Sequence, residues 1–227
     1  MLFRTSLPAL LGGALLIASA AARAAAAPPA AQTPAPVANA TPVLHTCMPD
    51  VPERERLMTL DVATFDRSEN GWRLYAGAKC YSQAAELIEG YLDSRASLRA
   101  DDQSILRYHA SQMLADANRA DDAVSELRVV LALEPQRPHP DMGWTQYIRG
   151  FVGFLMQDRP ALDKAVLELD IYAKAETGKL QAGDQINLNA LHGLQRCYGK
   201  DYAFAYSSPD CRDFAEVDKL NEVLDKP

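Results

Sequence analysis

The sequence lacks the short motifs that mark the commoner catalytic sites. It contains no His-Glu-x-x-His, no Gly-x-Ser-x-Gly and no glycine-rich phosphate loop. Its four histidines (His45, His109, His139 and His192) are scattered along the chain. His109 and His192 fall on expected helices, and a catalytic base needs an oriented partner, so we interpret both as packing or surface residues. We predict no catalytic residues and a protein that is not an enzyme.

Long apolar runs are missing beyond residue 24. Leu7–Ala22 is apolar and small, follows Arg4, and leads into Ala22-Arg23-Ala24, which fits a small-x-small cleavage site. The run is short for a bilayer span, which needs roughly 20 residues, and an uncleaved anchor is the alternative. Residues 1–24 are therefore predicted to be a signal peptide, cleaved on export to the periplasm or beyond the cell. No membrane span is expected after its removal.

Positive charge is also scarce. The chain has 23 basic and 30 acidic residues, and without Arg4 and Arg23 it keeps 21 against 30, a net charge of −9. Such a chain is a poor ligand for nucleic acid, whose binding depends on neutralised phosphates, and for anionic lipid. We expect its partner to be a protein or an extended peptide of the cell envelope.

Four cysteines, Cys47, Cys80, Cys197 and Cys211, follow the expected signal peptide. They include no Cys-x-x-Cys pair and no cysteine–histidine spacing of a zinc site, so neither metal nor cofactor is predicted. An even number in an exported chain favours disulfides, and four cysteines allow three pairings. We favour Cys47–Cys80 and Cys197–Cys211, because each joins neighbours in sequence.

The chain after residue 24 divides by composition. Residues 25–42 are rich in alanine and proline, cannot bury a core, and are expected to form a disordered linker. The remainder, 43–227, is long enough for one domain. Its start, Val43–Thr59, is predicted to be irregular, because Pro49 and Pro52 break helices.

The most regular pattern lies in residues 103–135. Two stretches with apolar side chains at helical spacing flank Asn118–Asp121, a turn so short that the two helices must pack as antiparallel neighbours. Asp102 or Ser104 is expected to cap the first helix. The second starts with acidic residues that suit the helix dipole, and Pro135 stops it. The apolar residues are Ile105, Tyr108, Met113 and Leu114, then Ala123, Leu127, Val130 and Leu131.

These residues resemble a tetratricopeptide (TPR) repeat, a helix pair of about 34 residues with small residues where the helices touch and a proline at its end. Ala123 matches the small residue of the second helix, and Pro135 closes an "ALEP" ending. The likeness is strongest over residues 104–135 and extends more weakly over 65–175. It implies an all-α, right-handed stack of antiparallel helix pairs, a TPR-like α-solenoid.

A regular offset supports this reading. Ala84, Ala123 and Leu162 are equivalent positions, separated by 39 residues and again by 39. About three helix pairs are predicted, at 64–94, 103–135 and 143–175, with Trp72, Tyr75 and Ala76 on one helix of the first pair. A cap over 184–227, braced by a disulfide, covers the end of the stack. It contains a helix from Asp184, an irregular stretch Tyr198–Asp210, and a last helix Arg212–Leu224.

In TPR proteins the first helix of each pair lines a concave groove that binds extended peptides. The resemblance therefore implies a ligand groove formed by Glu69, Arg73, Tyr108, Gln112, Trp144, Tyr147 and Phe151. The lysine–asparagine clamp of the family's best-known site is absent, which disfavours a terminal carboxylate as ligand. The alternative is that Tyr147, Phe151 and Phe154 are core residues, since aromatic side chains at helical spacing are usually buried.

Three functions remain open from the sequence. The first is a non-enzymatic periplasmic module that binds a protein or peptide. The second is a self-associating scaffold of an envelope complex, and the third is a hydrolase of an envelope polymer with its site in the 198–211 loop, near Lys200, Asp201 and Asp210. The absence of catalytic motifs favours the first.

Overall fold

The computed structural model describes residues 47–67, 70–95, 97–177 and 182–224. Contacts divide the chain into residues 1–40 and 41–227, and all described residues belong to the second unit. The predicted signal peptide and linker therefore lie outside the described residues. Within these residues the chain is entirely helical and forms no β-strand.

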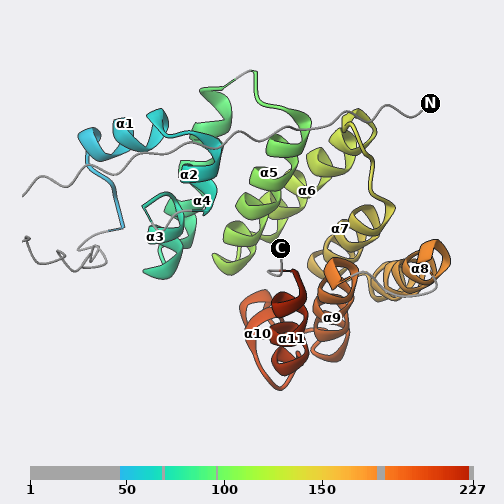
Figure 1. Ribbon diagram of the computed structural model, residues 1–227. Coiled ribbons are helices and arrows are strands. Elements are labelled where there is room, and N and C mark those ends of the chain that lie inside the picture. Colours follow the sequence, from blue (N-terminus) through green and yellow to red (C-terminus); the bar gives the residue numbers. More distant parts are fainter. Residues whose placement is uncertain (1–46, 68–69, 96, 178–181, 225–227) are drawn as a thin grey trace, which may run out of the picture. The chain divides into compact units, whose positions relative to one another are not determined.

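The helices follow one another along the chain with short connections (Figure 1). They are α1 (Val51–Thr59), α2 (Val62–Arg67), α3 (Arg73–Gly77), α4 (Tyr81–Asp93), α5 (Ala100–Asp116), α6 (Ala120–Leu133), the 3₁₀ turn η1 (Glu134–Gln136), α7 (Met142–Leu155), α8 (Arg159–Thr177), α9 (Ala182–Arg196), α10 (Tyr202–Ser207) and α11 (Phe214–Leu224).

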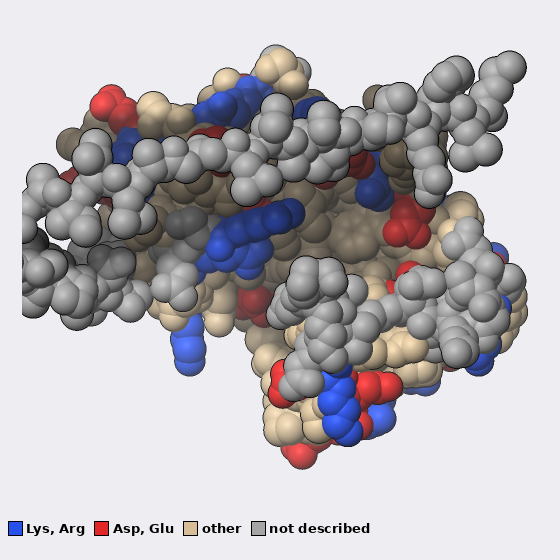
Figure 2. All heavy atoms as spheres, in the orientation of Figure 1, with Lys and Arg blue, Asp and Glu red and all other residues tan. Residues whose placement is uncertain are grey.

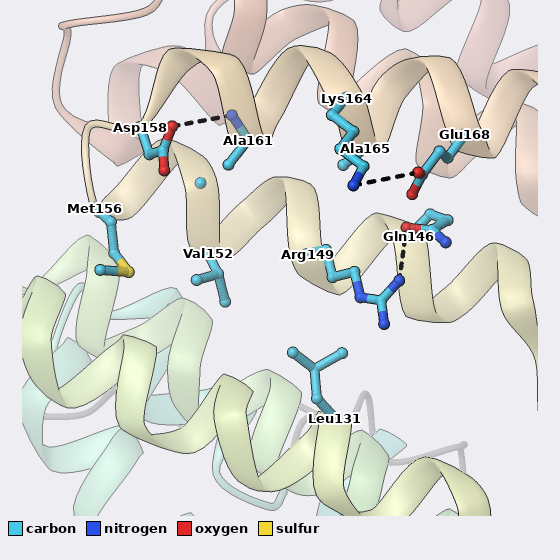
Figure 3. Close-up of a pocket in the computed structure, with 11 residues that line it drawn as sticks. Leu131, Gln146, Arg149, Val152, Met156, Asp158, Ala161, Lys164, Ala165 and Glu168 are labelled. Carbon is cyan, nitrogen blue, oxygen red and sulfur yellow. Dashed lines mark hydrogen bonds and ion pairs between the residues drawn. The ribbon is translucent and has the colours of Figure 1, made fainter.

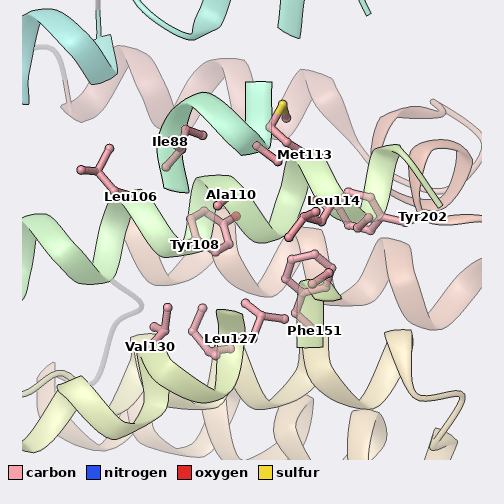
Figure 4. Close-up of a cluster of buried hydrophobic side chains, with 14 of the residues drawn as sticks. Ile88, Leu106, Tyr108, Ala110, Met113, Leu114, Leu127, Val130, Phe151 and Tyr202 are labelled. Atoms are coloured by element: carbon pink, nitrogen blue, oxygen red, sulfur yellow. The ribbon is translucent and has the colours of Figure 1, made fainter. Parts of the chain in front are cut away.

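Neighbours in sequence are neighbours in space. The most extensive contacts join α5 to α6 and α7 to α8, which are the pairs expected at 103–135 and 143–175, and α4 packs on α5. Each pair buries the apolar stripe that its spacing predicts. Figure 4 shows part of the resulting core, which includes Leu106 and Leu114 of α5 and Leu127 and Val130 of α6.

The predicted offset of 39 residues is present in the structure. Ala84, Ala123 and Leu162 are each the fourth residue of their helix, α4, α6 and α8, and each side chain is 0% exposed. A small or well-fitted side chain at this point lets the second helix of a pair lie close against the first. Equivalent sequence positions thus occupy equivalent surroundings.

The turns between paired helices repeat with the same offset. Lys79, Asn118 and Gln157, again 39 residues apart, have left-handed φ angles of 61°, 59° and 55°. At the middle turn the Arg119 N–H donates to the Leu114 carbonyl at 2.8 Å, and the corresponding bonds of the other two turns measure 2.9 Å and 2.8 Å. A residue with a left-handed φ angle, followed by a backbone hydrogen bond of this kind, commonly ends a helix and provides donors for its last carbonyls.

The first helix pair differs from its prediction. The first helix expected from residue 64 is broken into α2 and α3, and only Tyr75 and Ala76 of its three named residues lie within α3, since Trp72 precedes it. Gly71 explains part of the break: a Cβ there would lie 2.0 Å from the Phe65 carbonyl oxygen. The chain therefore doubles back tightly after α2.

Three shorter predictions were wrong. Val51–Thr59 is a helix, because Pro52 sits in its first turn, where a missing N–H costs nothing, and Asp50 accepts from the Glu53 N–H at 2.8 Å. The stretch predicted to be irregular after residue 198 contains α10, which Asp201 caps by accepting from the Phe204 N–H. Helix α5 begins at Ala100, two to four residues before its expected caps.

Both favoured disulfides are present. Cys47–Cys80 ties the segment before α1 to the start of α4. Cys197–Cys211 closes the loop that carries α10. None of the described helices is both long enough and apolar enough to cross a bilayer.

Candidate functional site

A pocket of about 550 Å³ lies where α2, α3 and the first half of α5 meet. Its floor combines apolar side chains with a buried polar network, and its rim carries three arginines. The lining residues are Asp61, Val62, Ala63, Asp66, Arg67, Arg73, Arg99, Asp102, Ile105 and His109. We call it the α2–α5 pocket.

Asp66 is the centre of the network. Its side chain is 8% exposed, and its Oδ1 accepts from Trp72 Nε1 at 3.0 Å and from His109 Nδ1 at 2.7 Å. Arg73 Nη2 lies 3.6 Å from the same oxygen, and Arg73 Nε donates to the Asp66 carbonyl. One buried carboxylate thus holds the side chains of Trp72, Arg73 and His109 in fixed positions.

His109 is held at both ring nitrogens. Arg73 Nη2 lies 3.4 Å from His109 Nε2, and a guanidinium can only donate, so Nε2 accepts and the proton sits on Nδ1, facing Asp66. Because Nε2 is engaged by Arg73, this histidine has no lone pair directed at the pocket. The arrangement orients Arg73, whose guanidinium also lies 4.4 Å from the centre of the Trp72 ring.

The network keeps Asp66 ionised. Burial alone would raise the pKa of this carboxyl, but the hydrogen bonds from His109 and Trp72 and the charge of Arg73 outweigh burial and lower the pKa. Asp66 therefore stays a pure acceptor across the ordinary pH range. It fixes the site and is not poised to exchange a proton.

The rim offers charge of both signs. Arg99 pairs with Asp102 through bonds of 2.9 and 3.0 Å, and Asp61 accepts from the Thr64 hydroxyl at 2.7 Å. Arg67 makes no ion pair with any other described residue. In Figure 2 basic and acidic side chains are mixed over this side of the molecule and do not gather into a field of one sign.

A smaller pocket of about 170 Å³ continues from the first and shares Ile105 with it. Trp144 of α7 lines it and donates its indole N–H to Ser104 Oγ at 3.4 Å. At its edge Arg137 pairs with Asp101 at 2.6 Å and with Glu134 at 3.0 Å, which ties η1 to α5. We call this the α5–α7 pocket.

The structure divides the predicted groove residues into two groups. Arg73 lines the α2–α5 pocket, Trp144 lines the α5–α7 pocket, and Glu69 lies outside the described residues. Tyr108, Tyr147 and Phe151 are 7%, 2% and 1% exposed, so none of the three is open to a ligand in this structure. The alternative noted for α7 holds, because Tyr147, Phe151 and Phe154 are core residues.

The cause of this burial is α10. Tyr202 stacks on Phe151 with ring centres 4.8 Å apart, and Gln112 donates to the Tyr202 hydroxyl at 3.3 Å. Beneath them the Tyr108 and Tyr147 hydroxyls are 2.6 Å apart, and burial raises the pKa of both phenols well above 10. Sequence reasoning missed this arrangement because it placed residues 198–210 in an irregular cap over the end of the stack, with no contact to Gln112 or Phe151.

Another pocket, of about 430 Å³, lies between α6, α7 and α8 (Figure 3). Its charged side chains are already paired: Lys164 with Glu168 at 3.7 Å, and Arg149 with the Gln146 side chain at 3.4 Å. Nothing in the sequence singled it out, and no residue of the predicted groove lines it.

The described residues hold no cluster of three or more potential metal ligands. Asp201 caps α10, and its carboxylate accepts from the Phe204 N–H, the role that a helix start requires. What the α2–α5 pocket and the α5–α7 pocket offer together is a set of fixed hydrogen-bond donors beside apolar and aromatic walls, which is suited to binding. No protein-family model, no curated protein and no solved structure matches the chain.

Proposed function

We propose that the protein is a non-enzymatic binding module of the periplasm or extracellular space, built as a TPR-like stack of antiparallel helix pairs, that binds a protein or peptide segment of the cell envelope. The α2–α5 pocket and the α5–α7 pocket form its site. The observation that carries the proposal is the fixed Arg73, held by Asp66 and His109 at the rim of a 550 Å³ pocket. Arg73 is also one of the groove positions that the TPR resemblance implies.

The chemistry of the site suits a peptide better than a small apolar ligand. Arg67 and Arg73 present donors to backbone carbonyls or acidic side chains, while Ile105 and Trp144 supply apolar and aromatic walls a short distance away. Extended peptides are usually recognised by hydrogen-bond donors to their backbone together with apolar pockets for their side chains. Two disulfides support an exported setting.

The test is site-specific photo-crosslinking in intact cells. A photoreactive residue at Ile105 is expected to trap an envelope protein, and the same residue at exposed Arg128 on α6 is the matched control. Adding Arg67→Glu should reduce the Ile105 adduct at least fivefold by removing a donor without disturbing the buried network. Equal adducts at both positions, or an adduct indifferent to Arg67→Glu, would reject this site.

A self-associating scaffold is the second candidate, and an exposed apolar pair on α8 favours it. Leu167 and Ile171, one helical turn apart, are 58% and 57% exposed. Multi-angle light scattering from micromolar to near-millimolar protein separates the two functions. A mass that rises with concentration in the native chain but not in Leu167→Asp would support the scaffold.

A further inference from the structure

Helix α10 lies against a surface made by helices distant from it in sequence. It contacts α5 and α9, and through Tyr202 it reaches Phe151 of α7. Its inner face, Tyr202 and Ala205, is 4% and 0% exposed, whereas Phe204 on the other face is 41% exposed. A helix of six residues is not stable by itself, so these contacts and the Cys197–Cys211 disulfide determine where it lies.

The surface beneath α10 belongs to the repeats. Tyr108 and Tyr147 are 39 residues apart, as equivalent positions of the second and third helix pairs are. Both lie where the resemblance placed ligand contacts, and Gln112 and Phe151 follow each of them by one helical turn. Arg73 is the counterpart of Gln112 and Phe151 in the first pair, and it lines the α2–α5 pocket, which α10 does not line. Helix α10 therefore covers the binding positions of two helix pairs and leaves the first pair open.

Arg212 anchors the base of the α10 loop. Arg212 is 6% exposed, donates to Asn189 Oδ1 at 3.3 Å and to the Tyr206 carbonyl at 3.1 Å, and a Cβ on Gly193 would lie 2.3 Å from Arg212 Cγ. At the tip, Gln112 of α5 donates to the Tyr202 hydroxyl at 3.3 Å, and the Tyr206 side chain hydrogen-bonds to Tyr147 of α7. The disulfide keeps the two ends of the loop together wherever the tip lies.

We propose that α10 is a built-in occupant of the groove, and that a partner segment of the same chemistry replaces it there. The partner is a helical turn with two aromatic side chains four residues apart, as Tyr202 and Tyr206 are, the first with a hydroxyl within reach of Gln112. The inner ring stacks on Phe151, as Tyr202 does at 4.8 Å. This inference rests on the proposed binding function and extends it from the open pockets to the covered aromatic surface.

The test uses a chain in which residues 199–209 are replaced by a glycine–serine linker of equal length, with both cysteines kept. The probe is a fluorescent peptide with the sequence of residues 199–209. We expect the opened chain to bind this peptide at least tenfold more tightly than the native chain does. Tyr202→Ala in the peptide, or Gln112→Ala in the opened chain, should weaken binding at least fivefold. An opened chain that melts cooperatively but binds the native and Tyr202→Ala peptides equally would overturn the proposal.

Hydrogen exchange on the native chain tests whether α10 leaves the groove, even if the opened chain does not fold. The Ala205 and Ser208 amides, bonded to the Asp201 and Phe204 carbonyls at 3.0 and 2.9 Å, report on α10 alone. Release of α10 predicts that they exchange at least 100-fold faster than interior amides of α5. Exchange at the rate of α5 would mean that α10 leaves only on global unfolding and is a structural cap. Crosslinking at Ile105 does not depend on either result, so the proposed function is tested separately.

Discussion

Asp116, at the last turn of α5, is a half-buried carboxyl without a compensating partner. It makes no hydrogen bond to any other described residue, and burial raises its pKa from 3.8 to about 6. Tyr81 and Tyr202 both feel its charge, which places it between the first helix pair and the α10 loop. We predict that replacing Asp116 with asparagine stabilises the protein at neutral pH.

The sign follows from proton linkage. The folded state holds the Asp116 proton more tightly than the unfolded state does. Below about pH 4 the carboxyl is protonated in both states, and it imposes no penalty on the free energy of unfolding. The penalty then grows as the pH rises to about 6. A shift of about two units corresponds to about 3 kcal/mol, and solvent contact of the partly exposed carboxyl reduces this to about 2 kcal/mol. Asparagine has nearly the same shape and never becomes charged.

The measurement is urea unfolding followed by far-ultraviolet circular dichroism at pH 7.5 and pH 4.0. The free energy of unfolding of Asp116→Asn should exceed that of the native chain by about 2 kcal/mol at pH 7.5 and by less than about 0.5 kcal/mol at pH 4.0. Asp122→Asn is the control, since exposed Asp122 pairs with Arg119 at 2.7 Å and should gain nothing. An equal gain for Asp116→Asn at both pH values would refute the reasoning.

Two further predictions concern packing and the aromatic cluster. Gly153→Ala should lower the free energy of unfolding by about 2–3 kcal/mol, because the new Cβ would lie 2.7 Å from the Leu162 backbone nitrogen where α7 crosses α8. Gly77→Ala, with no atom within 4 Å of its Cβ, should be neutral or stabilising by up to about 1 kcal/mol in the same urea assay. Tyr147→Phe should cost about 1–2 kcal/mol, because it leaves the buried Tyr108 hydroxyl without its partner at 2.6 Å; an unchanged unfolding midpoint would contradict that bond.

The sequence predicts the helices whose stability comes from one regular apolar stripe. The α5–α6 and α7–α8 pairs lie close to their expected bounds, because spacing of three and four residues fixes which face is buried. The offset of Ala84, Ala123 and Leu162 reappears because a small or well-fitted residue is needed wherever two helices meet after a tight turn. Local rules suffice for these elements.

The same reasoning fails where contacts distant in sequence decide the outcome. Asp66 and His109 are 43 residues apart, and no local pattern shows that they are hydrogen-bonded to each other. Helix α10 is too short for a periodic signal, so its helical state depends on Phe151 and Gln112, some 50 and 90 residues earlier in the chain. The break before α3 depends on the close approach of Gly71 to Phe65. Each case is a tertiary contact that overrides a local preference.

The burial of the predicted groove residues has a physical explanation. Repeats that place tyrosines at equivalent positions, as Tyr108 and Tyr147 are, produce a continuous aromatic surface along the first helices of the pairs. If this surface were exposed to water, the folded state would lose roughly 25 cal/mol of stabilisation for each square ångström of apolar area. Helix α10 covers that aromatic surface. In the first pair, Asp66 and Arg73 make charged contacts instead of aromatic ones, so this pair remains open without exposing a large apolar area to water. The open and covered parts of the proposed groove thus differ in chemistry, and a ligand of the kind we propose would present charge or carbonyls to one part and an aromatic turn to the other.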